Sequence, residues 1–297
     1  LDKHGIPPRL FLFAHYFDPH APYDPPAPFD TMYDPEGTEG MPTTKELRRG
    51  KGMPPRDRER YAERMELLYA SEISYTDYHV GRLLDGLRER GVLDDALVVI
   101  TSDHGESMWE HGEEFTHGLY VYQSTMHALG LIRLPGGERG GMRVAGTVAS
   151  IDILPTVLEY MGLPVPEGVD GEAIPLDDTA ADMAPRTRYG EATYPHRRVE
   201  TDPRWININK PRCVREGSFK YVITPYLGTE ELYDLEADPR EVRNLIELNA
   251  PDIVDRRRGL AEKLVDWTFS ADPLPSHFDS SQKEETEARL RSLGYLQ

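Results

Sequence analysis

The 297-residue chain has a single cysteine, Cys213, and no long apolar run. One cysteine excludes an internal disulfide framework and any zinc site built from several cysteines, although it leaves catalysis by a lone thiol open. The longest apolar runs, at 10–14, 96–100 and 129–132, are far shorter than the roughly 20 residues that span a bilayer. The sequence therefore predicts no transmembrane helix.

Basic side chains are outnumbered as well. The 34 lysines and arginines stand against 52 aspartates and glutamates, which gives a formal charge of −18. A phosphate backbone would repel such a chain, because its binding needs clustered Lys and Arg, so we expect no nucleic-acid partner. With 38% hydrophobic residues, the chain can still bury a sizeable core, in one large domain or a large and a small one.

Short apolar runs alternate with helical patterns, which is typical of an α/β protein. Buried strands of a parallel or mixed sheet are predicted at 9–14, 97–101 and 129–134, with a further candidate at 143–150. Amphipathic spacing predicts a long helix over 56–90, with a candidate break near Tyr78 and an end at Gly91. A short helix is predicted over 152–161, with Asp152 as its N-cap.

After about Arg186 the pattern changes to short strands separated by turn signals. These strands are predicted at 213–215, 219–224 and 231–233. They indicate a small antiparallel sheet, followed by a helix over 251–268 and a charged helix over about 282–293. We divide the chain into an α/β part at 1–185, a small α+β subdomain at 186–275 and a charged terminal helix or tail at 276–297.

Histidines gather between His104 and His127, where four of the ten in the chain occur. Asp103 and His104 directly follow the predicted strand 97–101, and ligands of open α/β sheets bind at the carboxyl ends of strands. A carboxylate and an adjacent imidazole can bind one divalent cation, and Gly105 permits the sharp turn that lets them converge. The alternative is that Asp103 caps a turn and His104 is a buried structural histidine.

Four segments of the chain carry a family resemblance. They read LFAHYFDPHAPYDPP at 12–26, VVITSDHGESMWEHGEEFTHG at 98–118, IDILPTVLEYMGLPVPEGVDG at 151–171 and ELYDLEADPREVRNL at 231–245. Together they closely resemble the sulfatase family of the alkaline phosphatase superfamily, in the family's order over nearly the whole chain. The resemblance implies a mixed, largely parallel central sheet flanked by helices, with residues 1–185 as the C-terminal part of the catalytic domain.

The resemblance also implies a metal site. Sulfatases hold one divalent cation, usually calcium, between two acidic residues near the N-terminus, an Asp-Asn or Asp-His pair and the nucleophile. Asp103 and His104 match that pair. The ion would polarise a sulfate oxygen, and the histidine ligand leaves manganese and zinc open beside calcium.

Two further histidines match residues that touch the sulfate group in sulfatases. The family's Pro-His-x-Pro-Tyr segment is Pro19–Tyr23 here, which implies that His20 contacts the sulfate and serves the leaving alcohol. Relatives carry a lysine or histidine shortly after the metal aspartate, and His117 lies fourteen residues after Asp103. The match implies that protonated His117 stabilises charge on the transferring group.

The remaining candidates have weaker support. His111 is either a substrate-contacting or supporting residue of the site or a structural histidine, and His15 and His127 are expected to pack or cap. Cys213 lies in the predicted small sheet and outside any Cys-x-Pro-x-Arg pattern, so we expect it to be structural.

The sequence lacks the nucleophile of the family. Sulfatases oxidise the first residue of Cys/Ser-x-Pro-x-Arg to formylglycine, and no such pentapeptide occurs in these 297 residues. The chain starts at Leu1 without methionine or a signal-peptide pattern, so we interpret the start as an internal cut. The formylglycine is expected upstream of this chain, and we expect no turnover from these residues alone.

The predicted function is metal-dependent hydrolysis of a sulfate monoester on a small molecule or a glycan. One alternative is a phosphonate monoester or phosphodiester hydrolase, or a phosphoethanolamine-type transferase, of the same superfamily, because the Asp-His-Gly-Glu core is shared. Another is a non-catalytic sulfatase-like scaffold or binding module. The oligomeric state stays open.

Overall fold

The computed structural model describes residues 9–33, 58–113, 115–144, 146–192 and 210–270, together with Gly5 and Pro7. Its α-helices are α2 (Arg58–Glu89), α3 (Gln123–Met126), α4 (Ile153–Tyr160) and α6 (Pro251–Ser270). Short 3-10 turns are η1 (Phe29–Thr31), η3 (Glu110–Gly112), η4 (Pro135–Gly137), η5 (Ser150–Asp152) and η6 (Asp178–Asp182). The strands are β1 (Val98–Thr101), β2 (Gly130–Arg133), β3 (Arg188–Glu191), β4 (Arg212–Glu216), β5 (Phe219–Thr224) and β6 (Thr229–Asp234).

Helix α2 confirms the predicted long helix and continues through Tyr78 without the candidate break. Its buried side chains Tyr61 and Met65 belong to one core cluster with Phe115, which lies in residues 104–127, the histidine-rich segment. Gly91, with a φ of +67°, ends the helix and donates its N–H to a carbonyl of the last turn. Neither α2 nor any other helix in the described part of the chain is apolar enough over a sufficient length to cross a membrane.

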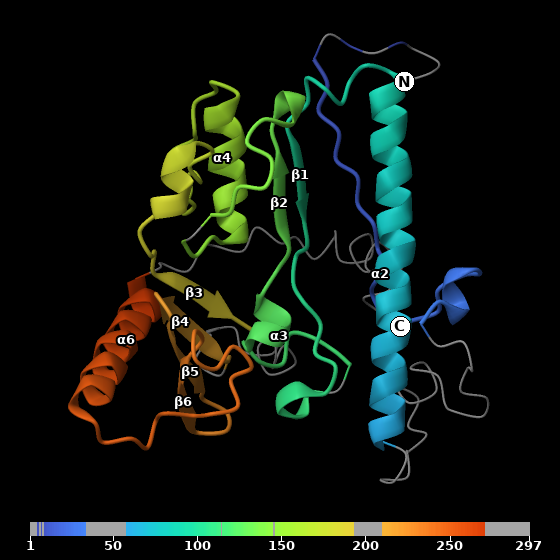
Figure 1. The fold of residues 1–297 in the computed structure, drawn as a ribbon. Coiled ribbons are helices and arrows are strands. Elements are labelled where there is room, and N and C mark those ends of the chain that lie inside the picture. Colours follow the sequence, from blue (N-terminus) through green and yellow to red (C-terminus); the bar gives the residue numbers. More distant parts are fainter. Residues whose placement is uncertain are drawn as a thin grey trace, which may run out of the picture.

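Strands β1 and β2 confirm two of the predicted strands and form a two-stranded antiparallel ribbon between α4 and α2 (Figure 1). Val98 lies opposite Arg133, and Thr101 lies opposite Gly130. Every strand pair among the described residues is antiparallel, so these residues do not confirm the largely parallel central sheet.

Two strand predictions are wrong. Residues 9–14 form no strand, and Phe11 and Phe13 are 86% and 79% exposed. A continuous apolar run becomes a buried strand only where neighbouring strands and layers cover it, and no described strand pairs with this segment. The described residues of 143–150 also form no strand, because the Ala149 N–H binds the Asp152 carboxylate at 2.9 Å instead of joining a ladder.

Asp152 occupies the predicted N-cap position of α4, but its carboxylate binds groups outside that helix instead of capping it. The side chain is fully buried and accepts the backbone N–H groups of Ala149 and Glu172, each at 2.9 Å. Arg188 Nη2 also donates to Asp152, at 2.7 Å from Oδ2, the oxygen that accepts the Ala149 N–H. Asp152 therefore joins the start of α4 to β3, far along the chain.

The C-terminal strands form a four-stranded antiparallel sheet in the order β3-β4-β5-β6. Strands β4 to β6 and α6 confirm the predicted small sheet and helix, whereas β3 was missed because its Arg-Tyr-Gly-Glu sequence is short and polar. Nothing in the structure tests the domain boundaries, and the helix predicted at 282–293, with the tail at 276–297, lies outside the described residues.

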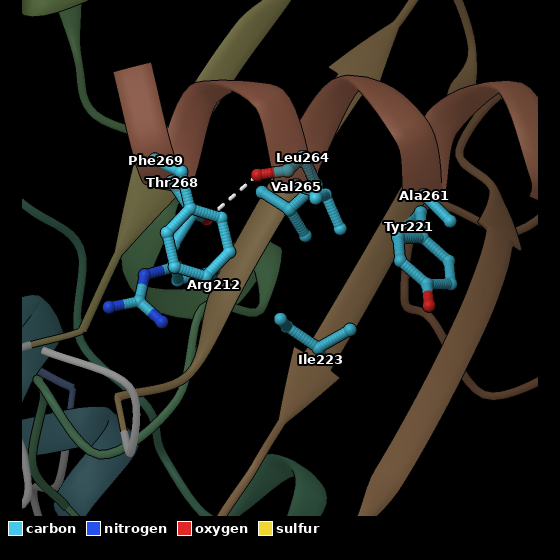
Figure 2. A pocket seen from close by; sticks show the side chains of 8 residues that line it. All are labelled: Arg212, Tyr221, Ile223, Ala261, Leu264, Val265, Thr268 and Phe269. Carbon is cyan, nitrogen blue, oxygen red and sulfur yellow. Dashed lines mark hydrogen bonds between the residues drawn. The ribbon is translucent and has the colours of Figure 1, made fainter. Parts of the chain in front are cut away.

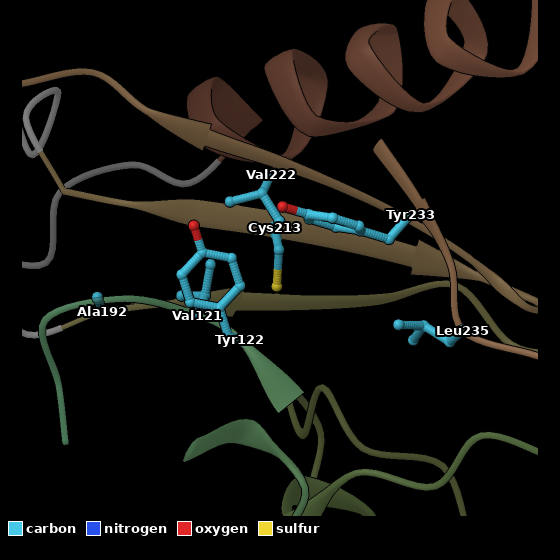
Figure 3. Close-up of a cluster of buried hydrophobic side chains, with 7 residues drawn as sticks. All are labelled: Val121, Tyr122, Ala192, Cys213, Val222, Tyr233 and Leu235. Carbon is cyan, nitrogen blue, oxygen red and sulfur yellow. The ribbon is translucent and has the colours of Figure 1, made fainter. Parts of the chain in front are cut away.

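The two faces of this sheet pack against different partners. Helix α6 covers one face, where Leu260 and Leu264 join a buried cluster with Val214. An open, mostly apolar pocket of about 170 Å³ lies between α6 and this face (Figure 2). The opposite face carries Cys213 and contacts Tyr122, which belongs to the histidine-rich segment 104–127 (Figure 3). The sheet thereby becomes a support for that segment.

Removing the Asp152 carboxylate should destabilise the fold. In Asp152→Ala two backbone N–H groups lose their acceptor and Arg188 loses its closest carboxylate, so we expect the free energy of unfolding to fall by about 3–5 kcal/mol. Urea denaturation followed by circular dichroism measures the change. Asp178→Ala is the control, because that carboxylate is exposed, and should change stability by less than about 0.5 kcal/mol. Equal stability of the two variants would contradict this role.

Candidate functional site

The site begins at the end of β1, where hydrogen bonds join the chain to the residue before β2. Thr101 Oγ1 donates to the Leu129 carbonyl at 2.9 Å, and the Leu129 N–H donates to Ser102 Oγ at 2.9 Å. These bonds fix the point at which the chain leaves the strand. Asp103 and His104 follow immediately, as the sequence predicted.

Gly105 allows this turn to pack closely against α3. Its N–H donates to the Thr125 carbonyl at 2.8 Å, and a Cβ placed on Gly105 would lie only 2.2 Å from the carbonyl oxygen of Ser124. Any side chain would therefore displace either the turn or α3. The glycine serves a close backbone approach rather than a left-handed conformation.

The Asp103–His104 pair has the donor chemistry of part of a metal site. Nδ1 of His104 lies 2.7 Å from the carbonyl oxygen of Gly105, so this nitrogen donates, and Nε2 faces Asp103 Oδ2 at 3.6 Å. A metal-binding histidine usually donates its other N–H to such a carbonyl, which leaves one nitrogen lone pair beside the carboxylate. Within the described residues, no third His, Cys, Asp or Glu completes a group that could hold a metal ion. The pair fits an ion that takes further ligands from elsewhere.

Three of the predicted site histidines lie together, although they come from different segments. The rings of His104 and His117 are stacked with centroids 3.8 Å apart. His20 meets His117 edge to face at 5.6 Å, and its Nδ1 lies 2.7 Å from the Ala21 carbonyl oxygen. His20, His104 and His117, with Asp103 beside them, form what we call the histidine cluster.

Two carboxylates missed by the sequence analysis hold the loop that carries His117. Glu106 Oε1 lies 3.3 Å from His117 Nδ1, and its side chain is 5% exposed. Glu113 is buried and accepts the Leu119 N–H at 2.9 Å, while burial raises the pKa of its carboxyl. Glu106 belongs to the Asp-His-Gly-Glu motif, so its position beside the metal pair was the available signal.

A third missed carboxylate holds the loop that carries His20. Glu72 is buried on α2, and its Oε1 accepts the Asp24 N–H at 2.6 Å. Burial, together with the nearby carboxylates of Asp18 and Asp24, raises the pKa of Glu72 to about 7 against the opposing effect of that hydrogen bond. Glu72 shares the apolar face of α2 with Met65, and a carboxylate on an apolar helix face was the signal in the sequence.

The contacts of His111 favour the structural alternative. This residue has a φ of +54°, stacks on Tyr122 at 3.7 Å and directs Nε2 to the Arg240 carbonyl oxygen at 3.2 Å. His111 thus joins the histidine-rich segment to the C-terminal sheet. Cys213 is buried, and burial raises the pKa of its thiol, which agrees with a structural cysteine rather than a nucleophile.

Comparison with protein families gives two overlapping matches to this chain. The sulfatase family model matches residues 7–163, which include every member of the histidine cluster. The chain belongs to the sulfatase family. A second model, for the C-terminal part of N-sulphoglucosamine sulphohydrolase, matches residues 110–268 and covers the four-stranded sheet and most of α6 of this chain.

Individual relatives agree with the family assignment. The chain is 28% identical to a multifunctional alkaline phosphatase superfamily protein, PehA, from Trinickia caryophylli, over 92% of this chain and 58% of that protein. It is also 28% identical to an arylsulfatase from Clostridium perfringens, over 80% of this chain and 49% of the relative. A phosphonate monoester hydrolase structure from Silicibacter pomeroyi superposes with a TM-score of 0.62 at 24% identity, over 89% of this chain and 55% of the other. The chain thus spans about half the length of these relatives.

Replacing Glu72 should reduce the pH dependence of stability. The folded state keeps a proton on Glu72 up to about pH 7, whereas an ordinary carboxyl with a pKa of 4.5 releases it earlier. The raised pKa of Glu72 thus stabilises the folded state fully below about pH 4.5. This contribution, roughly 3 kcal/mol, is lost as pH rises through 7. Glu72→Gln cannot ionise, so its free energy of unfolding should rise relative to the unaltered chain across this range.

Denaturation curves collected between pH 4 and 8, with unit steps, measure this difference. Glu66→Gln is the matched control, because Glu66 is exposed on the same helix. The prediction fails if Glu72→Gln and Glu66→Gln give parallel stability curves over this pH range.

Proposed function

We propose that the protein hydrolyses sulfate monoesters, on a small molecule or a glycan. The observation that supports this most strongly is the histidine cluster, in which His20, His104 and His117 converge from separate segments of a sulfatase-family chain. Four residues that match sulfatase motifs thereby lie at one place, with side chains suited to metal binding and proton transfer.

In this proposal Asp103 and His104 hold one divalent ion, with calcium as the first candidate and manganese and zinc as the alternatives. The Gly105 carbonyl keeps His104 Nε2 beside the carboxylate, which leaves an oxygen and a nitrogen donor at the same place. A bound ion would polarise a sulfate oxygen. Its other ligands are proposed to lie in the part of the sulfatase fold that this chain does not span.

His117 and His20 are proposed to act on the sulfate group and on the leaving alcohol. Glu106 orients His117. The protonated imidazole of His117 stabilises negative charge on the transferring group. His20 has its Nδ1 directed to the Ala21 carbonyl, so its other nitrogen, Nε2, is the one that would protonate the leaving oxygen. The Glu72 contact keeps the His20 loop in position on α2.

The nucleophile is proposed to be a formylglycine outside this chain. The sequence contains no Cys/Ser-x-Pro-x-Arg segment, and its one cysteine is buried in the small sheet. Attack on sulfur would therefore come from a residue that these 297 positions do not supply. The cluster described here would bind the sulfate, hold the ion and move the proton.

Phosphonate monoester or phosphodiester hydrolysis is the second candidate. It is favoured by the similarity to PehA, a relative named as multifunctional, which extends over 92% of this chain. Sulfate and phosphonate monoesters present similar tetrahedral anions, and the histidine cluster has the charge and proton donors to act on either. Competing substrates therefore belong in the first activity assay.

The activity test uses the protein expressed from the full reading frame that encodes this chain. We expect release of 4-nitrophenol from 4-nitrophenyl sulfate, with kcat lowered roughly 10²–10⁴-fold in His20→Ala and in His117→Ala. His127→Ala is the matched control, because this exposed histidine lies outside the histidine cluster, and it should keep its activity.

The same assay separates the alternatives. Faster release from 4-nitrophenyl phenylphosphonate or bis(4-nitrophenyl) phosphate would select the second candidate, and no release from any ester would indicate a non-catalytic scaffold. Full activity in both His20→Ala and His117→Ala would remove these residues from the mechanism.

Metal binding can be tested on this chain by itself. With two ligands we expect weak Mn²⁺ binding, with a Kd of about 10⁻⁴–10⁻³ M, measured by electron paramagnetic resonance of the free ion. Asp103→Asn and His104→Ala should each weaken it at least roughly tenfold, because each removes one of two donors. Ca²⁺ and Zn²⁺ competition compares the candidate ions. Unchanged Mn²⁺ affinity in both variants would show that the pair is not the site.

A further inference from the structure

The segment that follows the C-terminal sheet contributes a buried carboxylate to the support of the histidine cluster. We propose that Glu241 is a positioning residue that holds the turn of Asp103 and His104 through α3. The proposal rests on the function proposed above for that turn, and its structural part can be measured without metal or substrate.

Glu241 is only 2% exposed, and both oxygens of its carboxylate accept hydrogen bonds. Its Oε1 accepts from the ammonium of Lys220 at 2.7 Å, and its Oε2 accepts the backbone N–H of Gln123 at 2.5 Å. Gln123 is the first residue of α3, so the carboxylate binds the start of this helix. Lys220 is itself 1% exposed, so each charge is compensated by the other inside the protein.

The backbone of Glu241 indicates that this position is constrained. Its φ of +55° lies in the left-handed region, which residues other than glycine seldom adopt and which costs of order 1 kcal/mol or more. Such a conformation persists where the surroundings determine it. Here both carboxylate oxygens have partners, and they account for the constraint.

Helix α3 passes this restraint to the metal pair. Two residues after Gln123, the carbonyl of Thr125 accepts the Gly105 N–H at 2.8 Å. A shift of α3 would therefore move the acceptor of Gly105, and the close approach of Gly105 to Ser124 leaves no space for the turn to follow independently. The path from Lys220 on β5 to Gly105, the residue after His104, contains three hydrogen bonds and one turn of helix.

Residues of β6 and of the segment after it also contact the residues that precede α3. The Tyr122 hydroxyl donates to the carboxylate of Glu231 at 2.9 Å, and His111 Nε2 lies 3.2 Å from the Arg240 carbonyl oxygen. These contacts hold the segment that precedes α3. Glu241 is the member of this set that binds α3 itself.

The experiment measures hydrogen exchange of the Gly105 amide by NMR. In Glu241→Ala the N–H of Gln123 loses its acceptor, so α3 should loosen and the Gly105 amide should exchange at least roughly tenfold faster. Glu241→Gln keeps an oxygen for Gln123 but loses the charge pair with Lys220, and it should exchange at an intermediate rate. This second variant retains the side-chain volume and tests the proposal if Glu241→Ala does not fold.

Leu264→Ala is the control, because Leu264 lies on α6 and is buried against the opposite face of the sheet. It should lower the urea midpoint of global unfolding, whereas the native-state exchange rate of the Gly105 amide should stay equal to that of the unaltered chain. Mn²⁺ affinity, measured in parallel, should fall in Glu241→Ala and stay constant in Leu264→Ala.

Equal Gly105 exchange in the Glu241 variants and the unaltered chain would overturn the proposal. So would an equal local effect of Leu264→Ala, which would reduce Glu241 to a general contributor to stability. Failure of the proposed sulfatase function is a separate outcome, because it appears as absent metal binding or turnover while the exchange result stands.

Discussion

The close packing of Gly105 against α3 is the contact on which the arrangement of the site depends. Only a residue without a side chain can bring the turn after β1 to the Ser124 carbonyl and still donate its N–H to Thr125. This contact orients Asp103 and His104 toward the loop of His117. Because α3 is bound in turn by the C-terminal sheet, the metal pair is held from two distant parts of the chain.

Buried carboxylates hold the loops of this acidic protein. Glu72, Glu113, Asp152 and Glu241 each accept at least one backbone N–H group from a loop or the start of a helix. A buried carboxylate is stable only where hydrogen bonds or a cation compensate its desolvation. Those requirements fix the partner groups in space, which gives irregular segments a defined conformation and keeps the histidine cluster together.

The histidine cluster is the part of a sulfatase site that we propose for this chain. It brings together two metal-ligand types and two imidazoles for charge and proton transfer, while the chain spans about half the length of its relatives. The part of the relatives that this chain spans includes the exposed apolar segment at 9–14 and the two-stranded ribbon of β1 and β2.

The sequence by itself determined the family, α2, α6 and strands β4 to β6, and it singled out the three histidines whose rings the fold brings together. Local periodicity and motifs of adjacent residues carry this information, since each depends on neighbours a few positions apart. The strand predicted at 9–14 was wrong for the complementary reason: an apolar run shows what a segment is suited to, whereas partner strands decide whether it forms one. The small polar strand β3 was missed because its pairing with β4, rather than its composition, makes it a strand.

Only the tertiary structure decided which residues support the site. The motifs suggested that His20, His104 and His117 act together, and the fold placed their rings in contact. It also assigned His111 to the contact with the C-terminal sheet. Glu72 binds a backbone group 48 residues away and Glu241 one 118 residues away, and no local pattern encodes such pairings. They arise because folding buries each carboxylate where a particular N–H group is the partner that can compensate its lost hydration.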